Sequence, residues 1–513
     1  MGQKESFIEA IKKGYTFKGQ SVKIGAGMLN GEVLPEAEIF LPLATLNRHG
    51  LIAGATGGGK TKTFQMIAEL LSENSIPSLL LDIKGDLSGL AAKAESNDKI
   101  EARYQKLNMK FEPAAFPVEL LTLSNEKGVR LRATVSEFGP ILLSKILGLN
   151  DTQGSIVSMI FKYSDDNNLP LLDLKDFIKM LQFAGDEGKK ELQVNYGNIS
   201  TSSLGTILRK VIELQQQGAD QFFGEKSFEV EDLMRMDDKG RGMINILRVT
   251  DLQDRPKLFS SFMLQLLSEL YEYMPEEGDM DKPKLILFID EAHLIFEEAS
   301  KALLDKIETV IKLIRSKGVG IYFCTQNPMD VPADVLGQLG LKIQHTLRAF
   351  TANDRTTIRQ TAKNYPETTF YNTEDLITQL GIGEALVTLL NEKGIPTPLA
   401  HVMMGTPRSR MDILTPTEIE DITSRSTLVK KYNEEIDRQS AFEILSAKIE
   451  AVAAQDEKTA ERPAREEKST FEKVVNNSVV KSFMRTTGNL VIRSLLGTLG
   501  ISGRRRKSTK SLF

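Results

Sequence analysis

Residues 54–61 read GATGGGKT, directly after an apolar run at 51–53 and directly before a helical pattern. This order of strand, glycine-rich turn, lysine and threonine is typical of a phosphate-binding loop. Glycines let backbone N–H groups surround the phosphates, the lysine reaches the β- and γ-oxygens, and the threonine hydroxyl binds Mg²⁺. The motif therefore predicts a site for ATP and Mg²⁺, formed by Gly54, Ala55, Thr56, Gly57, Gly58, Gly59, Lys60, Thr61 and Lys62.

Apolar runs rich in strand-forming residues alternate with helical patterns from residue 49 onward. They lie at 49–55, 77–85, 118–123, 242–249, 284–293, 318–326, 341–348 and 384–390. Several are almost continuously apolar, as expected of strands that are covered on both faces. The alternation predicts an α/β fold with a doubly wound, largely parallel sheet.

The patterning divides the chain into five parts. We expect a short β-rich lead-in at 1–48 and an ATPase core at 49–125 and 241–408. The stretch 126–240 has mostly helical periodicity and is predicted to be a helical insertion. Residues 409–468 read as a charged helical extension followed by a polar linker, and 469–513 as a basic amphipathic tail.

The charge of the chain is uneven. The net charge is −4, but residues 469–513 contain nine Lys and Arg against one acid, Glu472. This tail therefore carries +8 and the rest of the chain −12. Such asymmetry predicts that the tail finds a polyanion, an acidic partner or an anionic membrane surface, unless it is only a solvated terminus.

Composition excludes several classes of protein. No apolar stretch approaches the roughly 20 residues of a membrane-spanning helix, and the N-terminus has no signal-peptide core. With 41% hydrophobic and 26% charged residues, we expect a cytoplasmic protein. The single cysteine, Cys324, excludes an internal disulfide, and the four histidines lack ligand spacing, so structural zinc is not expected.

The stretch LILFIDEAH at 285–293 complements the phosphate loop. An apolar strand here ends in two adjacent acids, Asp290 and Glu291, which a simply buried strand does not explain. Asp290 would hold Mg²⁺ through water, and Glu291 would polarise the attacking water. The Asp-Glu pair favours an ATPase over a phosphate-transferring kinase.

Two further strands end in polar residues. Gln326 follows the strand at 320–325, where an amide can sense the γ-phosphate or position water. Cys324 beside it is expected to be a small buried hydrophobe. Asp82 and Lys84, with Asp86, follow the strand at 78–81; they either form a surface turn or contact Mg²⁺ and its water shell.

An arginine is also expected to act on the nucleotide of a neighbouring subunit. Arg315 follows a helix that leads into the glutamine strand, so it is poorly placed for its own nucleotide. Arg348, Arg355 and Arg255 are competing candidates, and each could be an ordinary surface arginine.

With these motifs the chain resembles the HerA-like (YjgR-type) ATPases of the HerA–FtsK superfamily over most of residues 20–410. The stretches PLATLNRHGLIAGATGGGKTKT, DIKGDLSGL, FIDEAHLIF, IRSKGVGIYFCTQNPMDVPADVLGQLG and IQHTLRAFTANDR carry the resemblance. It implies a RecA-like P-loop core in a homohexameric ring, with Asp290 and Glu291 as catalytic carboxylates and Gln326 as sensor. The trans-acting arginine carries over best to Arg315.

The resemblance implies a motor that pumps or unwinds double-stranded DNA. Only about fifty residues precede the loop here, whereas archaeal-type relatives begin with a sizeable β-barrel for partner docking. We expect an ATP-driven ring on DNA, gripping phosphates from the helical insertion or the segment after Gln326, through residues such as Lys342 or Lys317. The alternatives are an ATPase that remodels or tethers protein or membrane partners, and a slow nucleotide switch, against which the Asp-Glu pair argues.

Overall fold

The computed structural model describes residues 2–460, apart from 125, 251–254, 279, 297–300, 435 and 437. Residues 1–446 form one compact unit, and a second unit begins at Ala447. The predicted basic tail, 469–513, and the predicted linker beyond 460 lie outside the described residues.

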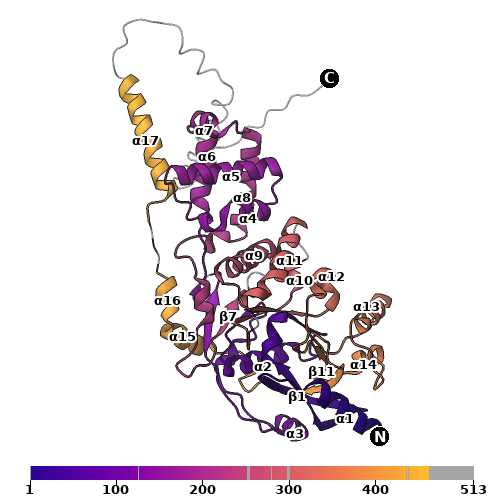
Figure 1. Cartoon of the computed structure of the whole chain (residues 1–513). Coiled ribbons are helices and arrows are strands. Elements are labelled where there is room, and N and C mark those ends of the chain that lie inside the picture. Colours follow the sequence, from indigo (N-terminus) through magenta and orange to yellow (C-terminus); the bar gives the residue numbers. More distant parts are fainter. Residues whose placement is uncertain are drawn as a thin grey trace, which may run out of the picture. The chain divides into compact units, whose positions relative to one another are not determined.

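A sheet of twelve strands runs through the described part of the first unit (Figure 1). Eight neighbouring strands are parallel. In spatial order they are β10 (Leu341–Gln344), β3 (Gly50–Ala53), β9 (Val319–Thr325), β8 (Leu285–Ile289), β4 (Ser78–Asp82), β7 (Ile244–Arg248), β5 (Val118–Thr122) and β6 (Val129–Arg130). The predicted α/β, RecA-like, largely parallel sheet is confirmed, and every predicted strand from residue 49 onward is present.

Four antiparallel strands extend the sheet beyond β10. They are β11 (Glu384–Leu389), β12 (Ala400–Met404), β1 (Ser21–Leu29) and β2 (Glu32–Pro42). The lead-in thus supplies α1 (Gln3–Gly14) and two strands of the central sheet, with Gly25 paired to Met404. Sequence patterning did not place β12, so it could not join the lead-in to the core.

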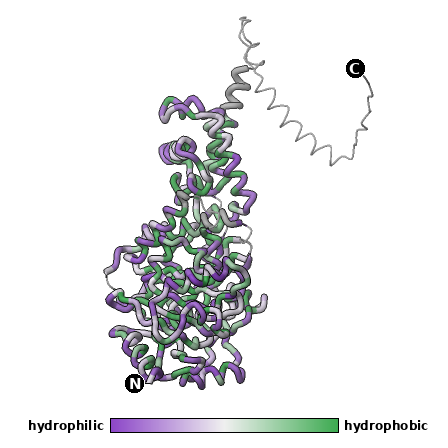
Figure 2. Tube along the Cα trace, turned by 90° about the vertical axis from the view of Figure 1, so that its right-hand side faces the viewer, coloured by the Kyte–Doolittle hydropathy of each residue, from purple (hydrophilic) through white to green (hydrophobic). Residues whose placement is uncertain are grey.

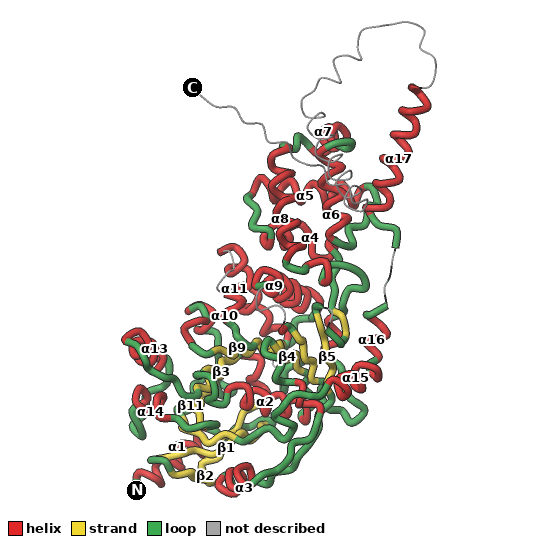
Figure 3. Tube along the Cα trace, turned by 180° about the vertical axis from the view of Figure 1, so that it is seen from behind, coloured by secondary structure: helices red, strands yellow, loops and turns green. Residues whose placement is uncertain are grey.

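Helices cover both faces of the sheet (Figure 3). Phe64 of α2 (Lys60–Glu73) stacks on Phe288 of β8 with ring centroids 5.6 Å apart, on the face that also carries Tyr322. Phe323 follows Tyr322 in β9 and so points to the opposite face, where Phe296 of α10 (His293–Phe296) packs at 5.7 Å. The fold is doubly wound because successive side chains of each strand are buried by different helices.

The region between β6 and β7 is mainly helical. Its helices are α4 (Val135–Ile146), α5 (Asp151–Asp166), α6 (Leu174–Gly185), α7 (Lys189–Tyr196) and α8 (Thr201–Gln216). Side-chain caps at Thr134, Asn150, Asp173 and Ser200 begin four of them by accepting otherwise unpaired backbone N–H groups. Hydrophobic and hydrophilic residues alternate along these helices (Figure 2), and their apolar faces form a local core that includes Phe161 against Phe177.

The remaining helices surround the core or follow it. They are α3 (Asp98–Lys106), α9 (Pro256–Tyr273), α11 (Lys301–Ile314), α12 (Ala333–Leu336), α13 (Ala352–Lys363), α14 (Thr373–Gln379), α15 (Pro416–Arg425), α16 (Thr427–Tyr432) and α17 (Ala441–Ala460). No helix in the described part of the chain is long and apolar enough to cross a membrane.

A C-terminal strap, residues 408–411, lies along α2. Glu69 of α2 accepts hydrogen bonds from the backbone N–H groups of Arg408 and Ser409, at 2.8 and 3.0 Å. Burial raises the pKa of Glu69 to about 7, although these hydrogen bonds oppose the rise. The strap therefore fixes the helix that begins at the phosphate loop.

Candidate nucleotide site

Three parallel strands carry the candidate residues to one edge of the sheet. In the register of the sheet Ala53 of β3 is paired with Thr325 of β9, and Ile289 of β8 with Phe323. The phosphate loop, Asp290 and Gln326 directly follow these residues. Because the strands are parallel, their carboxyl ends meet, which is where open α/β sheets bind ligands.

Three glycines give the phosphate loop its backbone conformation. Gly54, Gly57 and Gly59 have φ values of 150°, 79° and 114°, a region in which side chains are strained. Gly59 precedes the first turn of α2, so N–H groups at the start of this helix face the loop. Lys60 is buried and its Nζ donates to the carbonyl of Gly54 at 2.5 Å.

His345 supports the loop from the strand on its other side. Its Nδ1 lies 2.8 Å from the Glu384 carbonyl, so this nitrogen is the donor, and Nε2 accepts from the Thr63 hydroxyl at 3.0 Å. Burial lowers the pKa of His345 to about 4, which keeps the ring neutral at neutral pH. The next residue, Thr346, accepts a 2.7 Å hydrogen bond from the N–H of Ala55. The start of the loop is therefore hydrogen-bonded on both sides, to the end of β9 through Thr325 and to the residues after β10 through Thr346.

The two acids after β8 are buried, and their pKa values are shifted in opposite directions. Burial raises the pKa of Asp290 to about 6, with Lys84 opposing the rise. Burial alone would also raise the pKa of Glu291, but an ion pair with Lys84 and a hydrogen bond from Gln326 hold that pKa below its usual value. Glu291 also has a φ of 46°, a conformation unusual for a non-glycine residue and often found at functional sites. Glu291 is thus a carboxylate at neutral pH.

Gln326 connects the loop to this carboxylate. Its Nε2 donates to Glu291 Oε1 at 3.3 Å, and its Oε1 accepts from the Thr56 hydroxyl at 3.1 Å. The structure therefore brings together Lys60, Glu291 and Gln326, which the sequence motifs had indicated separately. Cys324, in the same strand, is fully buried.

The donor set around the loop fits a divalent cation. Asp290 Oδ2 and Glu291 Oε2 are buried oxygens with no hydrogen-bond partner among the described residues, although His293 Nδ1 lies 3.4 Å from Glu291 Oε2. Buried polar atoms without partners are uncommon and call for a ligand or water. Thr61, in the first turn of α2, adds a hydroxyl oxygen, and oxygen ligands are those that Mg²⁺ prefers.

Asp82 and Lys84, at the end of β4, have different roles. Asp82 accepts hydrogen bonds from the N–H groups of Gly85, Asp86 and Leu87, at 2.8 to 3.2 Å, so it forms the turn. Lys84 extends to Glu291 instead. Of the two alternatives for this stretch, the structure supports a turn for Asp82 and a place at the site for Lys84.

Other candidate side chains lie away from the loop. Lys62 donates to the Met411 carbonyl of the strap at 2.6 Å, so its ammonium faces away from the phosphates. Lys342 donates to the Asn364 carbonyl, and the Lys317 ammonium lies 5.1 Å from the centre of the Tyr271 ring. Each of these two lysines thus has a contact within the chain, and its role in gripping a phosphate backbone stays a prediction.

Arg315 lies at the amino-terminal end of β9, whereas the nucleotide site lies at the carboxyl ends of the parallel strands. It precedes β9, whereas the loop follows the carboxyl end of the parallel strand β3. The length of β9 separates these two ends by about 20 Å. The guanidinium is exposed, and no ion pair of Arg315 is recorded among the described residues. It does not meet its own nucleotide site.

The competing arginines differ in setting. Arg348 is exposed and lines a pocket of about 420 Å³ beside Thr56 and Gln326. Arg355 is exposed on α13, and Arg255 lies beside Gly218, close to α8. Arg348 is therefore the one competitor that adjoins the loop of its own chain.

Sequence reasoning missed His345 and the contact between Lys84 and Glu291. His345 directly follows an apolar strand, as Asp290 and Gln326 do, and this position is the signal in the sequence that points to it. The Lys84 contact depends on β4 lying beside β8, which the sequence does not reveal.

Gly54 and Gly57 offer a matched test of this packing. A Cβ on Gly54 would lie 2.6 Å from Cβ of His345, whereas a Cβ on Gly57 would meet nothing within 4 Å. Because both have positive φ, Gly54→Ala should lower the free energy of unfolding by about 2 kcal/mol more than Gly57→Ala. Chemical denaturation of the two variants measures the difference, and equal losses would contradict the close contact with His345.

Comparisons with known proteins agree with this geometry. The family model described as Helicase HerA-like C-terminal matches residues 28–507. The DNA double-strand break repair helicase HerA of Saccharolobus solfataricus is 22% identical over 387 residues, which are 75% of this chain and 69% of that protein. HerA of Sulfurisphaera tokodaii is 23% identical over 69% of this chain and 64% of that protein. The chain thus spans about two thirds of the length of these relatives.

A solved structure shares the fold. The bacterial conjugative coupling protein TrwBdeltaN70, in its unbound monoclinic form, superimposes with a TM-score of 0.50 and 13% identity, covering 79% of this chain and 94% of that one. The family match extends over most of the sequence and includes every residue of the nucleotide site. The chain therefore belongs to the HerA-like helicase family and is a nucleoside-triphosphate hydrolase with a RecA-like P-loop core.

Proposed function

We propose that this protein is an ATP-driven motor that moves double-stranded DNA through a ring of identical subunits, most simply a hexamer. The observation that carries the proposal is the hydrogen-bonded connection from Thr56 of the loop through Gln326 to Glu291 at the carboxyl ends of the parallel strands, while Arg315 lies at the amino end of β9. Its DNA substrate is supported by the relatives named as DNA double-strand break repair helicases. The cytoplasmic location stays a prediction.

Binding begins with the loop. On ATP binding the Lys60 ammonium leaves the Gly54 carbonyl for the β- and γ-phosphate oxygens, while loop N–H groups from Gly54 to Thr61 surround the phosphates. Thr61 and Asp290 are the residues that would hold Mg²⁺. The ion supplies positive charge that stabilises the transferring phosphoryl group.

Glu291 is the general base of the proposed hydrolysis. Its lowered pKa leaves it ionised, so it can accept a proton from the attacking water. Gln326 spans the space between this carboxylate and Thr56 of the loop, where an amide can orient that water. Lys84 occupies one carboxylate oxygen, and we assign it the role of a positioning residue that sets the pKa of Glu291.

Arg315 is assigned to the neighbouring subunit. Because it lies about 20 Å from its own loop, it can stabilise transition-state charge only across an interface. This arrangement makes each site incomplete without the next subunit, and hydrolysis is then coupled to the ring.

DNA dependence tests the function directly. We expect ATP turnover to rise when double-stranded DNA is added, and the logarithm of the apparent DNA-binding constant to fall linearly with the logarithm of salt concentration as phosphate contacts are lost. Lys60→Ala should lower turnover by about 100-fold or more, and this variant therefore measures the background hydrolysis of the assay. An ATP turnover that is unchanged by any added nucleic acid would contradict the DNA motor. It would favour an ATPase that remodels or tethers protein or membrane partners.

The Lys84–Glu291 ion pair makes a prediction about pH. Removing the ammonium in Lys84→Met lets burial raise the pKa of Glu291, so a higher pH is needed to ionise the base. The acidic limb of the kcat profile should move to higher pH, and Lys84→Arg should restore it. A profile that stays unchanged in Lys84→Met would show that this pair does not set the pKa of the base.

Arg315 is tested by mixing subunits. Arg315→Ala should bind ATP but lose about 10³-fold in turnover, whereas Arg425→Ala, on the exposed surface of α15, should hydrolyse normally. Mixing Arg315→Ala with Glu291→Gln should restore part of the activity, because some interfaces then combine an intact base with an intact arginine. Full ATPase activity of the Arg315→Ala protein by itself would show that Arg315 does not act on the nucleotide of a neighbouring subunit.

A further inference from the structure

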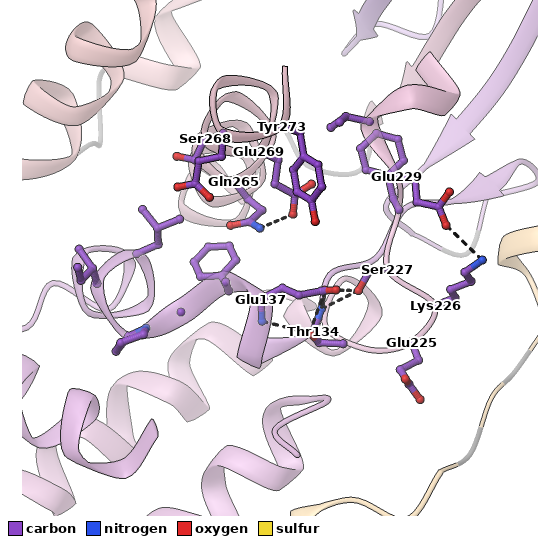
Figure 4. A pocket seen from close by; sticks show the side chains of 18 of the residues that line it. Thr134, Glu137, Glu225, Lys226, Ser227, Glu229, Gln265, Ser268, Glu269 and Tyr273 are labelled. Carbon is purple, nitrogen blue, oxygen red and sulfur yellow. Dashed lines mark hydrogen bonds and ion pairs between the residues drawn. The ribbon is translucent and has the colours of Figure 1, made fainter. Parts of the chain in front are cut away.

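A pocket of about 640 Å³ lies away from the nucleotide site, where the helical region joins the core (Figure 4). One wall is the start of α4, which kinks at Gly139, where φ is 72°. The second wall is the C-terminal half of α9, and the third is the segment 225–231. This volume is in the range of pockets that bind ligands. We call it the α4–α9 pocket.

The α4–α9 pocket is acidic. Its lining contains two lysines, Lys145 and Lys226, and six glutamates: Glu137, Glu225, Glu229, Glu231, Glu269 and Glu272. Glu137 is satisfied as the cap of α4, and Glu229 is paired with Lys226 and Lys431. No ion pair is recorded, in the part of the chain that the structure describes, for Glu231, Glu269 or Glu272. The pocket therefore repels phosphate and has spare negative charge.

Buried polar atoms in the lining also lack partners. Ser268 and Gln265 of α9 are only 7% and 5% exposed, and both line the pocket. The Ser268 hydroxyl and the Gln265 amide oxygen have no hydrogen-bond partner among the described residues, while the Gln265 amide nitrogen donates to Glu269 at 2.6 Å. Such atoms accept hydrogen bonds from a donor that enters the pocket.

The rim is apolar and exposed. Ile141 of α4 and Tyr273 of α9 are 67% and 70% exposed, although both line the pocket. Phe138 is buried beneath them. Exposed apolar side chains beside glutamates without ion pairs match a side chain with an aliphatic stem and a cationic end.

We propose that the α4–α9 pocket binds a lysine or arginine side chain, flanked by apolar residues, from a segment of a partner protein. The ammonium or guanidinium supplies only donors, which Glu269, the Gln265 oxygen and the Ser268 hydroxyl can accept, while Ile141 and Tyr273 contact the stem and its neighbours. No group of His, Cys, Asp and Glu with the arrangement of a metal site is found in the described residues, so a metal ion does not explain the cluster. The pocket is thus assigned to protein binding, at a place separate from the nucleotide site.

The pocket also bears on the catalytic segment. α9 packs against α10, which begins at His293, two residues after Glu291. An occupant held between α4 and α9 thus contacts the helix that packs against α10, and α10 follows the general base in the chain.

Peptide binding by the whole protein tests the proposal. Immobilised random hexapeptides are prepared in four sets, with lysine, arginine, norleucine or glutamate fixed at a central position. The wild-type protein should be retained about tenfold better by the lysine and arginine sets than by the norleucine set, the difference expected of one hydrogen-bonded charge. Retention that does not depend on the fixed residue would overturn the proposal.

A matched pair of variants separates the pocket from general charge. Glu269→Gln with Glu272→Gln removes two pocket charges without loss of volume, whereas Glu9→Gln with Glu36→Gln removes two exposed charges on α1 and β2. The first pair should abolish the preference for basic peptides and the second should keep it. Equal preference in both would show that net charge, not the pocket, attracts the peptides.

The dependence on pH provides a second readout. Burial raises the pKa of Glu269 to about 7, and Glu137, Glu272 and Glu231 reinforce the rise from α4, α9 and the third wall. Because this carboxyl loses its proton between pH 6 and 8, the preference for lysine peptides should strengthen over that interval. The cations of the lining are Lys145 and Lys226. A preference that weakens would contradict the role of Glu269.

Discussion

The pairing of β3 between β9 and β10 is the constraint on which the site depends. It places the phosphate loop where two neighbouring strands can hold it, through Thr325 and Thr346 as hydrogen-bond acceptors. The same parallel pairing brings Gln326 beside Thr56, and β8 adds Glu291 from the next position. Because the close packing of Gly54 on His345 leaves no space for a side chain, the loop has little freedom to shift alone. We therefore expect a shift of the loop on nucleotide binding or hydrolysis to move β9 and β10 with it.

Much of this site could be predicted from the sequence because its residues end apolar strands. Lys60, Asp290, Glu291 and Gln326 each follow a strand, and parallel strands bring such residues to one edge whatever their order in the chain. The antiparallel half of the sheet could not be predicted in the same way. β12 is a short run interrupted by His401, whose ring is paired with Glu384 at 3.0 Å, a contact between strands that only the fold creates. Without β12, the lead-in strands have no visible connection to the core.

The described charged groups bear on where DNA and protein partners could bind. The two lysines first considered for a DNA channel are engaged within the chain, Lys342 with the Asn364 carbonyl and Lys317 with the Tyr271 ring. The α4–α9 pocket is acidic and unsuited to a phosphate backbone. The α4–α9 pocket, formed by α4 and α9 together with residues 225–231, is therefore proposed for a protein contact and not for DNA.

Movement along DNA is the most direct measure of the central claim, because hydrolysis alone does not distinguish a motor from a switch. A third strand bound in the major groove of a linear duplex is displaced when a motor passes through it. We predict that the wild-type protein displaces a fluorescently labelled triplex strand with ATP and not with ADP, and that Glu291→Gln binds the duplex but displaces nothing. Rapid ATP hydrolysis on the same duplex, with the triplex strand left in place, would contradict the account.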